Sequence, residues 1–150
     1  MNPKKNSGFT LIELLVVIGI LAVLFSIVLI AINPARQFNQ ANNAKRRSDV
    51  IALLNAISQY RADLKGALPA GITTTVANIS NTGSDICADI MGPQLYLPAL
   101  PQDPAFNNGA QITDCTVAYD TNYTVVQDAS GRVTVAAPSA ALGEVISVTR

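Results

Sequence analysis

One stretch of this chain, residues 14–32, constrains its folding more than any other. It contains nineteen consecutive residues without a formal charge, most of them apolar. A helix of about 20 such residues covers the hydrocarbon core of a bilayer. Lys4 and Lys5 precede the stretch, and basic residues beside a span mark the end that stays in the cytoplasm. The sequence therefore predicts one membrane-spanning helix, with the residues after it outside the cytoplasm.

Three interpretations of this N-terminal segment compete. A secretory signal peptide has an apolar core of about 7–15 residues and an A-x-A-like cleavage site. Neither feature fits a run that ends in Ile32-Asn33-Pro34. A plain signal anchor accounts for the hydrophobicity but gives Glu13 no role. In the third interpretation the chain is cut between Gly8 and Phe9, and the apolar segment stays in the mature protein.

The carboxylate of Glu13 lies directly before the uncharged stretch, where a charge is costly. An acidic side chain at the centre of a bilayer is disfavoured by about 2.5–3.5 kcal/mol. A cation that joins the carboxylate inside a protein assembly offsets this cost. Glu13 is therefore expected to meet a cation in an assembly, unless it lies shallow enough to be partly hydrated.

Residues 8–18, with the sequence Gly-Phe-Thr-Leu-Ile-Glu-Leu-Leu-Val-Val-Ile, closely resemble the class III leader of type IV pilins and type II secretion pseudopilins. The resemblance implies a prepilin peptidase that cuts after Gly8 and methylates the new amino group of Phe9, giving N-methylphenylalanine. It also implies that this amino group pairs with Glu13 of an adjoining subunit, although a pair within one subunit stays open. The implied partners are further copies in a helical filament, an inner-membrane assembly platform and an ATPase.

Helical periodicity continues beyond Pro34, where the proline predicts a kink or a local break. Gly66 and Pro69 end the helical pattern. The polar residues expected largely on the other faces, away from the apolar stripe, are Arg46, Arg47, Asp49, Gln59, Arg61 and Asp63. A continuous helix over residues 9–65 would be about 85 Å long, so its second half is expected to pack on a small sheet. Its apolar stripe consists of residues at three- and four-residue steps: Val50, Leu53, Leu54, Ile57, Tyr60 and Leu64.

Runs of β-branched residues around turns predict an antiparallel sheet of three or four strands after Pro69. The expected segments are residues 71–76 as a loop or edge strand, 85–91 as a helical turn, 92–108 as an irregular loop, 116–119 leading to 123–127 as strand, 132–136 as its hairpin partner, and 145–148 as a last strand or tail. The predicted fold class is α+β, a pilin fold with a long N-terminal helix and a β-sheet head. The predicted divisions are a leader at 1–8, a transmembrane and assembly helix at 9–33, an amphipathic helix at 34–66 and the head at 67–150.

A second resemblance, to the major pseudopilin, lies in the head. Tyr60 precedes a Gly-x-x-Pro motif at residues 66–69, and the proline-bounded segment 96–104 ends in Asp-Pro. The chain departs from the pseudopilin pattern after Pro104, because it lacks the aromatic-glycine step and a clear terminal Asp-Gly calcium loop. No cofactor is therefore expected, and only weak calcium candidates remain, since scattered aspartates also cap turns. These candidates are Asp114, Asp120 and Asp128.

Cys87 and Cys115 are the only cysteines, and both belong to the part expected outside the cytoplasm, where disulfides persist. A bridge between them would close the proline-rich loop and stabilise the head by about 3–4 kcal/mol. Two free thiols are the alternative. The chain has no histidine, the commonest general base and metal ligand, and no zinc, nucleotide-binding or serine-nucleophile motif. It is not expected to be an enzyme.

Charge is divided unevenly along the chain. Residues 34–66 have six basic and two acidic residues, a net charge of +4, whereas residues 67–150 have two basic and seven acidic, a net charge of −5. This division fits either ordinary solvated faces or complementary contact between copies. No nucleic acid is expected as a partner of an acidic head. The basic residues that follow the span conflict with the positive-inside rule. Arg36 is the one nearest to the span.

These observations together predict a structural subunit of a type IV pilus-like filament, processed by prepilin peptidase and polymerised through its N-terminal helix. One alternative is the major pseudopilin of a type II secretion system. Another, of a different class, is a monomeric, membrane-anchored extracellular domain. The precursor is expected to cross the inner membrane once with its head outside the cytoplasm, and the filament to be extracellular or periplasmic.

Overall fold

The structure is a computed structural model that describes residues 8–92 and 96–150. Most of the expected leader, including Lys4 and Lys5, lies outside the described residues. The chain divides into two compact units, Met1–Gln37 and Phe38–Arg150.

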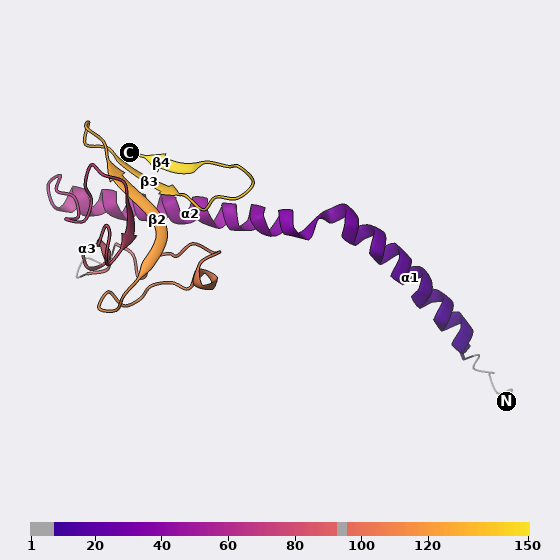
Figure 1. The fold of residues 1–150 in the computed structure, drawn as a ribbon. Helices are drawn as coiled ribbons and strands as arrows, with labels where there is room; N and C mark the ends of the chain where they lie inside the picture. The colour runs from indigo at the N-terminus through magenta and orange to yellow at the C-terminus, as the bar shows by residue number, and fades with distance from the viewer. Residues whose placement is uncertain (1–7, 93–95) are drawn as a thin grey trace, which may run out of the picture. The chain divides into compact units, whose positions relative to one another are not determined.

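The first unit is built on helix α1, Leu11–Ile32 (Figure 1). None of its residues is buried, and within the described ranges it is the one helix long and apolar enough to cross a membrane. Its 22 residues correspond to a length of about 33 Å, close to the thickness of a hydrocarbon core. The helix ends because Asn33 adopts the left-handed conformation, with φ of 45°.

Asn33 also begins the next helix, α2, Pro34–Asp63. Its side-chain Oδ1 accepts a hydrogen bond from the backbone N–H of Arg36 at 3.2 Å, as an N-cap residue does. Pro34 occupies the first helical position, where a missing N–H costs nothing. The helix is therefore interrupted at the Asn-Pro pair, as the sequence predicts.

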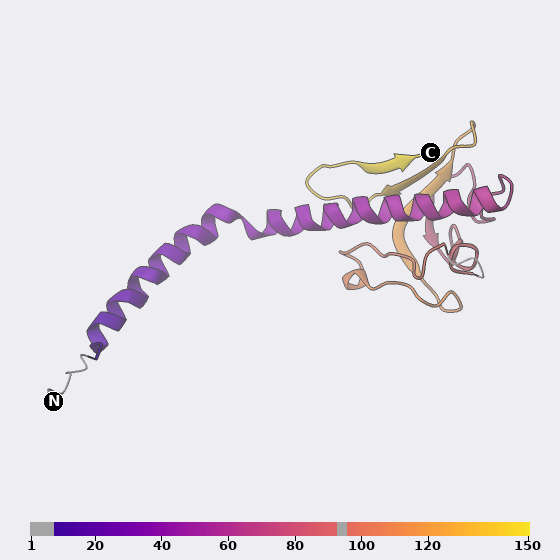
Figure 2. The ribbon, with the colours of Figure 1, turned by 180° about the vertical axis from the view of Figure 1, so that it is seen from behind.

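In the second unit, helix α2 lies across one face of a four-stranded antiparallel sheet (Figures 1 and 2). The strands are β1 Ala77–Ser80, β2 Asp120–Gln127, β3 Val133–Ala137 and β4 Ile146–Thr149, in the order β1-β2-β3-β4. Val125 pairs with Val135, and Ala136 pairs with Ser147. This architecture confirms the predicted α+β pilin fold.

Apolar residues of α2 and the sheet form the core, with the short helix α3, Cys87–Met91, at its border. Alternate residues of β2 and β3 are buried, as expected for a sheet with one covered face. The largest fully buried apolar side chains are Tyr123, Leu53, Leu54, Ile57, Ile79, Ile86, Ile90, Leu100, Val50, Val125 and Val135.

The apolar stripe of α2 ends earlier than predicted. Leu64 is exposed, because Lys65 and Gly66 take positive φ values of 55° and 99°. The N–H of Gly66 donates to the carbonyl of Arg61 at 2.8 Å and closes the helix. The chain therefore turns away at Leu64, and expecting this residue in the core stripe was wrong.

Residues 71–76 form a loop, one of the two forms predicted for them, and the edge strand β1 starts after them. The strand expected at residues 116–119 was wrong. Residues 115–117 form bends, and residues 118–119 are irregular. The Asp114 carboxylate holds this turn by accepting hydrogen bonds from both the N–H and the hydroxyl of Thr116. Such a local turn competes with strand pairing. Within the described part of 92–108 the loop is irregular up to the 3₁₀ turn Asn107–Gly109.

Candidate functional site

The two residues at the expected cleavage point precede α1 and are open to solvent. Phe9 is 88% exposed. A Cβ built on Gly8 would meet no atom within 4 Å. In this chain the peptide bond between Gly8 and Phe9 is thus accessible to an enzyme.

Thr10 and Glu13 form a capping box at the start of α1. The backbone N–H and the hydroxyl of Thr10 each donate to Glu13 Oε2 at 2.8 Å. The N–H of Glu13 donates in return to Thr10 Oγ1 at 3.3 Å. These bonds hold the carboxylate at the helix N-terminus, where the backbone dipoles favour a negative charge. A single copy therefore already stabilises the Glu13 charge.

Thr10 was not singled out from the sequence, although Thr-x-x-Glu before an apolar run is a capping signature. Both bonds from Thr10 reach Oε2, and no hydrogen bond to Oε1 occurs within the described residues. Phe9 and Glu13 line one shallow hollow together with Ile12, Val16 and Val17. In the uncut chain the Phe9 nitrogen is an amide, so its pairing with Glu13 of another copy stays a prediction.

A buried ion pair in the head was not anticipated from the sequence. Arg46 is only 2% exposed, and its guanidinium donates to both oxygens of Asp103, from Nε at 2.7 Å and from Nη2 at 2.8 Å. Nη1 donates to Asn43 at 3.0 Å. The hydrogen bond with Asp103 raises the pKa of Arg46. Placing Arg46 on a face other than the apolar stripe was wrong, since it lies one helical turn before Val50 and shares its stripe.

Asp49 is also buried, against the same expectation. Its carboxylate accepts hydrogen bonds from the Tyr123 hydroxyl at 2.9 Å and from Lys45. Burial, assisted by the neighbouring Asp49 charge, raises the pKa of the Tyr123 hydroxyl. Polar residues of α2 thus join the helix to the loop before β2 and to β2 itself.

The opposite charges of α2 and the head are partly used within one molecule. Besides the Arg46–Asp103 pair, Arg47 forms an ion pair with Glu144. Contacts within one molecule therefore explain part of the uneven charge distribution. This distribution had also been compatible with contacts between copies.

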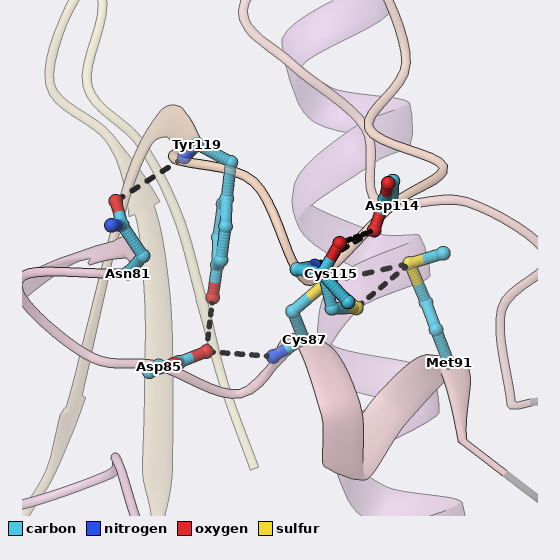
Figure 3. Close-up of a disulfide and its surroundings, with 8 residues drawn as sticks. Asn81, Asp85, Cys87, Met91, Asp114, Cys115 and Tyr119 are labelled. Carbon is cyan, nitrogen blue, oxygen red and sulfur yellow. Dashed lines mark hydrogen bonds between the residues drawn. A yellow bond between two sulfur atoms is a disulfide. The ribbon is translucent and has the colours of Figure 1, made fainter.

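Cys87 and Cys115 are joined by a disulfide that ties α3 to the loop before β2 (Figure 3). Met91 Sδ lies 3.7 Å from Cys87 Sγ and 4.0 Å from Cys115 Sγ. Beside the bridge, the Asp85 carboxylate accepts a hydrogen bond from the Tyr119 hydroxyl at 2.7 Å. The disulfide therefore lies inside a packed corner of the head.

The three calcium candidates do not come together as one site. Asp114 caps a turn at Thr116, Asp120 accepts from the Asn122 N–H, and Asp128 pairs with Arg132. Across residues 8–92 and 96–150, no three acidic or cysteine side chains are grouped as metal ligands. Hydrogen bonding to the Arg132 backbone is the main cause of the lowered pKa of Asp128.

Comparison with known proteins identifies the family. A profile described as the prokaryotic N-terminal methylation motif matches residues 3–31. The type II secretion system core protein G of Klebsiella pneumoniae is 34% identical over 101 residues, which cover 67% of this chain and 70% of the relative. The chain belongs to the type IV pilin and type II secretion pseudopilin family. The resemblance inferred from residues 8–18 is thereby confirmed.

Other members of this pseudopilin family show shorter matches. Core protein G of Aeromonas hydrophila is 41% identical over 63 residues, covering 42% of this chain and 43% of the relative. Core protein G of Escherichia coli strain K12 is 42% identical over 59 residues, 39% of each chain. No solved structure gave a significant match. The chain thus spans less than half the length of two of these relatives.

Proposed function

We propose that this chain is the major pseudopilin of a type II secretion system, a structural subunit that polymerises through its N-terminal helix. The similarity to core protein G of Klebsiella pneumoniae carries this proposal, because its 101 residues extend well beyond the leader. Pilins and pseudopilins share the leader, so the leader alone does not separate the two. The comparison therefore favours the pseudopilin alternative over the type IV pilus subunit put first from sequence.

In the proposed mechanism α1 holds the precursor in the inner membrane, with the head on the periplasmic side. Prepilin peptidase cuts between Gly8 and Phe9, which converts the Phe9 amide into an amine. Thr10 keeps one oxygen of Glu13 bonded, and Oε1 is the acceptor for the Phe9 amine of the adjoining subunit. In a low-dielectric assembly such a pair is much stronger than in water.

The subunit performs no catalysis in this proposal. The exposed apolar surface of α1 supports this view, because such a helix needs lipid or partner helices around it. Energy for moving the subunit out of the membrane comes from an ATPase of the assembly machinery. The filament then acts on exported proteins mechanically from the periplasm.

Deletion of the gene in its host tests the proposal against its alternatives. A secretion defect with normal surface fibres supports the pseudopilin. Loss of surface fibres with normal secretion indicates a type IV pilus subunit. Normal secretion, normal fibres and no crosslinked ladder in membranes indicate a monomeric anchored domain.

Mass spectrometry of the mature chain tests the processing step. The expected N-terminus is Phe9, heavier by one methyl group than the unmodified residue. An intact N-terminus at Met1 would contradict the proposed route.

A further inference from the structure

Arg36 is the basic residue closest to the outer end of α1, four residues after Ile32. It belongs to the same compact unit as α1. Residues 14–48 contain no aspartate or glutamate, so no acidic side chain lies one helical turn from Arg36. Its side chain is exposed. No hydrogen bond or ion pair engages its guanidinium within the described part of the chain.

The other basic residues early in α2 have acidic partners within the second unit. Lys45 bonds Asp49, Arg46 bonds Asp103, and Arg47 bonds Glu144. Acidic residues of α2 and of the head therefore account for these three cations and leave Arg36 for a partner of another kind.

The length of α1 gives the level at which Arg36 lies in a membrane. A helix of 22 residues spans about 33 Å, and the hydrocarbon core is about 30 Å thick. Arg36 follows the end of α1 by about one turn, roughly 6 Å. This places its guanidinium in the headgroup layer directly outside the hydrocarbon. Long arginine side chains near a span end commonly reach that layer.

We infer that Arg36 binds the phosphate of an anionic phospholipid in the outer leaflet and sets the depth of α1 before assembly. The planar guanidinium offers two parallel N–H donors to a phosphate, and an anionic surface attracts basic residues beside a span. The inference rests on the membrane stage of the proposed function and on no later step.

The same inference resolves the conflict with the positive-inside rule. That rule counts basic residues in short segments close to the span. Lys45, Arg46 and Arg47 are engaged by acidic residues of the folded second unit. The comparison of basic residues next to the span is then Arg36 on the outer side with Lys4 and Lys5 on the inner side. A single arginine bound to outer-leaflet phosphate is compatible with this orientation.

Native mass spectrometry of the full, uncut chain in detergent with added phosphatidylglycerol tests the inference. Arg36→Gln is expected to weaken phosphatidylglycerol binding about five-fold. Arg47→Gln is the matched control, because it removes the same charge from an exposed arginine of the head, and its binding is expected to equal that of the wild type. Arg36→Lys is expected to keep part of the binding, since lysine supplies a charge without the fork.

Equal phosphatidylglycerol binding by the wild type and Arg36→Gln would overturn the inference. So would an equal loss in Arg47→Gln, which would indicate a general charge effect. Equal binding of phosphatidylcholine, or displacement of the lipid by inorganic phosphate, would also overturn it. These binding measurements need no filament. Failure of lipid binding would contradict this inference alone, whereas normal secretion after deletion of the gene would contradict the proposed function alone.

Discussion

At the scale of single residues, two charged side chains in apolar surroundings are stabilised in different ways. Glu13 receives its hydrogen bonds from Thr10, three positions away in the chain. Arg46 receives its partner from Asp103, 57 positions away. A local partner forms with the helix itself, whereas a distant one requires the folded head. Substitutions at the two sites should therefore affect assembly and stability separately.

Thr10→Ala should weaken the start of α1 and leave Glu13 without its side-chain donor. Loss of a threonine N-cap costs about 0.5–2 kcal/mol, and filament yield is expected to fall while membrane insertion stays normal. Crosslinked ladders in membranes measure the yield. Thr10→Ser keeps the hydroxyl and serves as the control, so equal yields from the alanine and serine variants would contradict the role given to Thr10.

Arg46→Met should destabilise the head strongly, because Asp103 would remain buried without its cation. Breaking a buried pair from one side costs about 3–5 kcal/mol. The control, Arg47→Met, removes an exposed pair worth about 0–1 kcal/mol. Denaturant unfolding of the full chain in detergent compares the two variants. A small effect of Arg46→Met, no larger than that of Arg47→Met, would show that the pair contributes little.

At the scale of secondary-structure elements, β2 connects most of the head. It pairs with β1 on one side and β3 on the other, and its Tyr123 donates to Asp49 of α2. Tyr119, directly before β2, donates to Asp85 near the disulfide. Burial, with help from these carboxylates, raises the pKa of both hydroxyls. The position of β2 therefore depends on two neutral tyrosines.

Alkaline pH should destabilise the head for this reason. Below the ordinary tyrosine pKa of about 10, folded and unfolded states are both protonated, and the full stability is present. Above that pH the unfolded tyrosines ionise first, so the free energy of unfolding falls as pH rises toward the folded pKa. Unfolding midpoints between pH 8 and 12, roughly the range set by that pKa, measure the loss. Tyr123→Phe should show a weaker decline above pH 10, and an identical decline would assign the effect to other groups.

At the scale of the whole molecule, the chain combines an apolar anchor with a head that carries its own core. The anchor needs lipid or other helices because none of its residues is buried. The head has little regular structure between α3 and β2, and the disulfide joins the two ends of that segment. Covalent closure of this loop restricts the unfolded chain more than the folded one.

Replacing both Cys87 and Cys115 by serine should therefore lower the stability of the head by about 3–4 kcal/mol. The anchor should still insert into membranes. Denaturant unfolding of the oxidised wild type, the reduced wild type and the double variant measures the change. Equal midpoints for all three would show that the loop is held by its other contacts.

The sequence by itself determined the features that depend on neighbours close in the chain. The span, the break at Asn33-Pro34 and the hairpin before and after Gly131 follow from hydrophobic runs, backbone restrictions and turn residues. The leader resemblance identified the family for the same reason, since its motif is contiguous. The Thr10–Glu13 capping box is equally local, and its Thr-x-x-Glu pattern is readable in the sequence.

Only the tertiary structure decided which polar residues of α2 face inward. Arg46 lies on the core side because it pairs with Asp103, which is 57 positions away in the chain. Asp49 lies there because it accepts a hydrogen bond from Tyr123, which is 74 positions away. Similarly, Tyr119 is fixed directly before β2 by hydrogen bonds with Asn81 and Asp85 of the loop after β1. From the helical pattern alone, charged residues are expected to face water. They face the core only where a distant partner offsets the free-energy cost of their desolvation. Such partners exist only after the sheet has packed on α2.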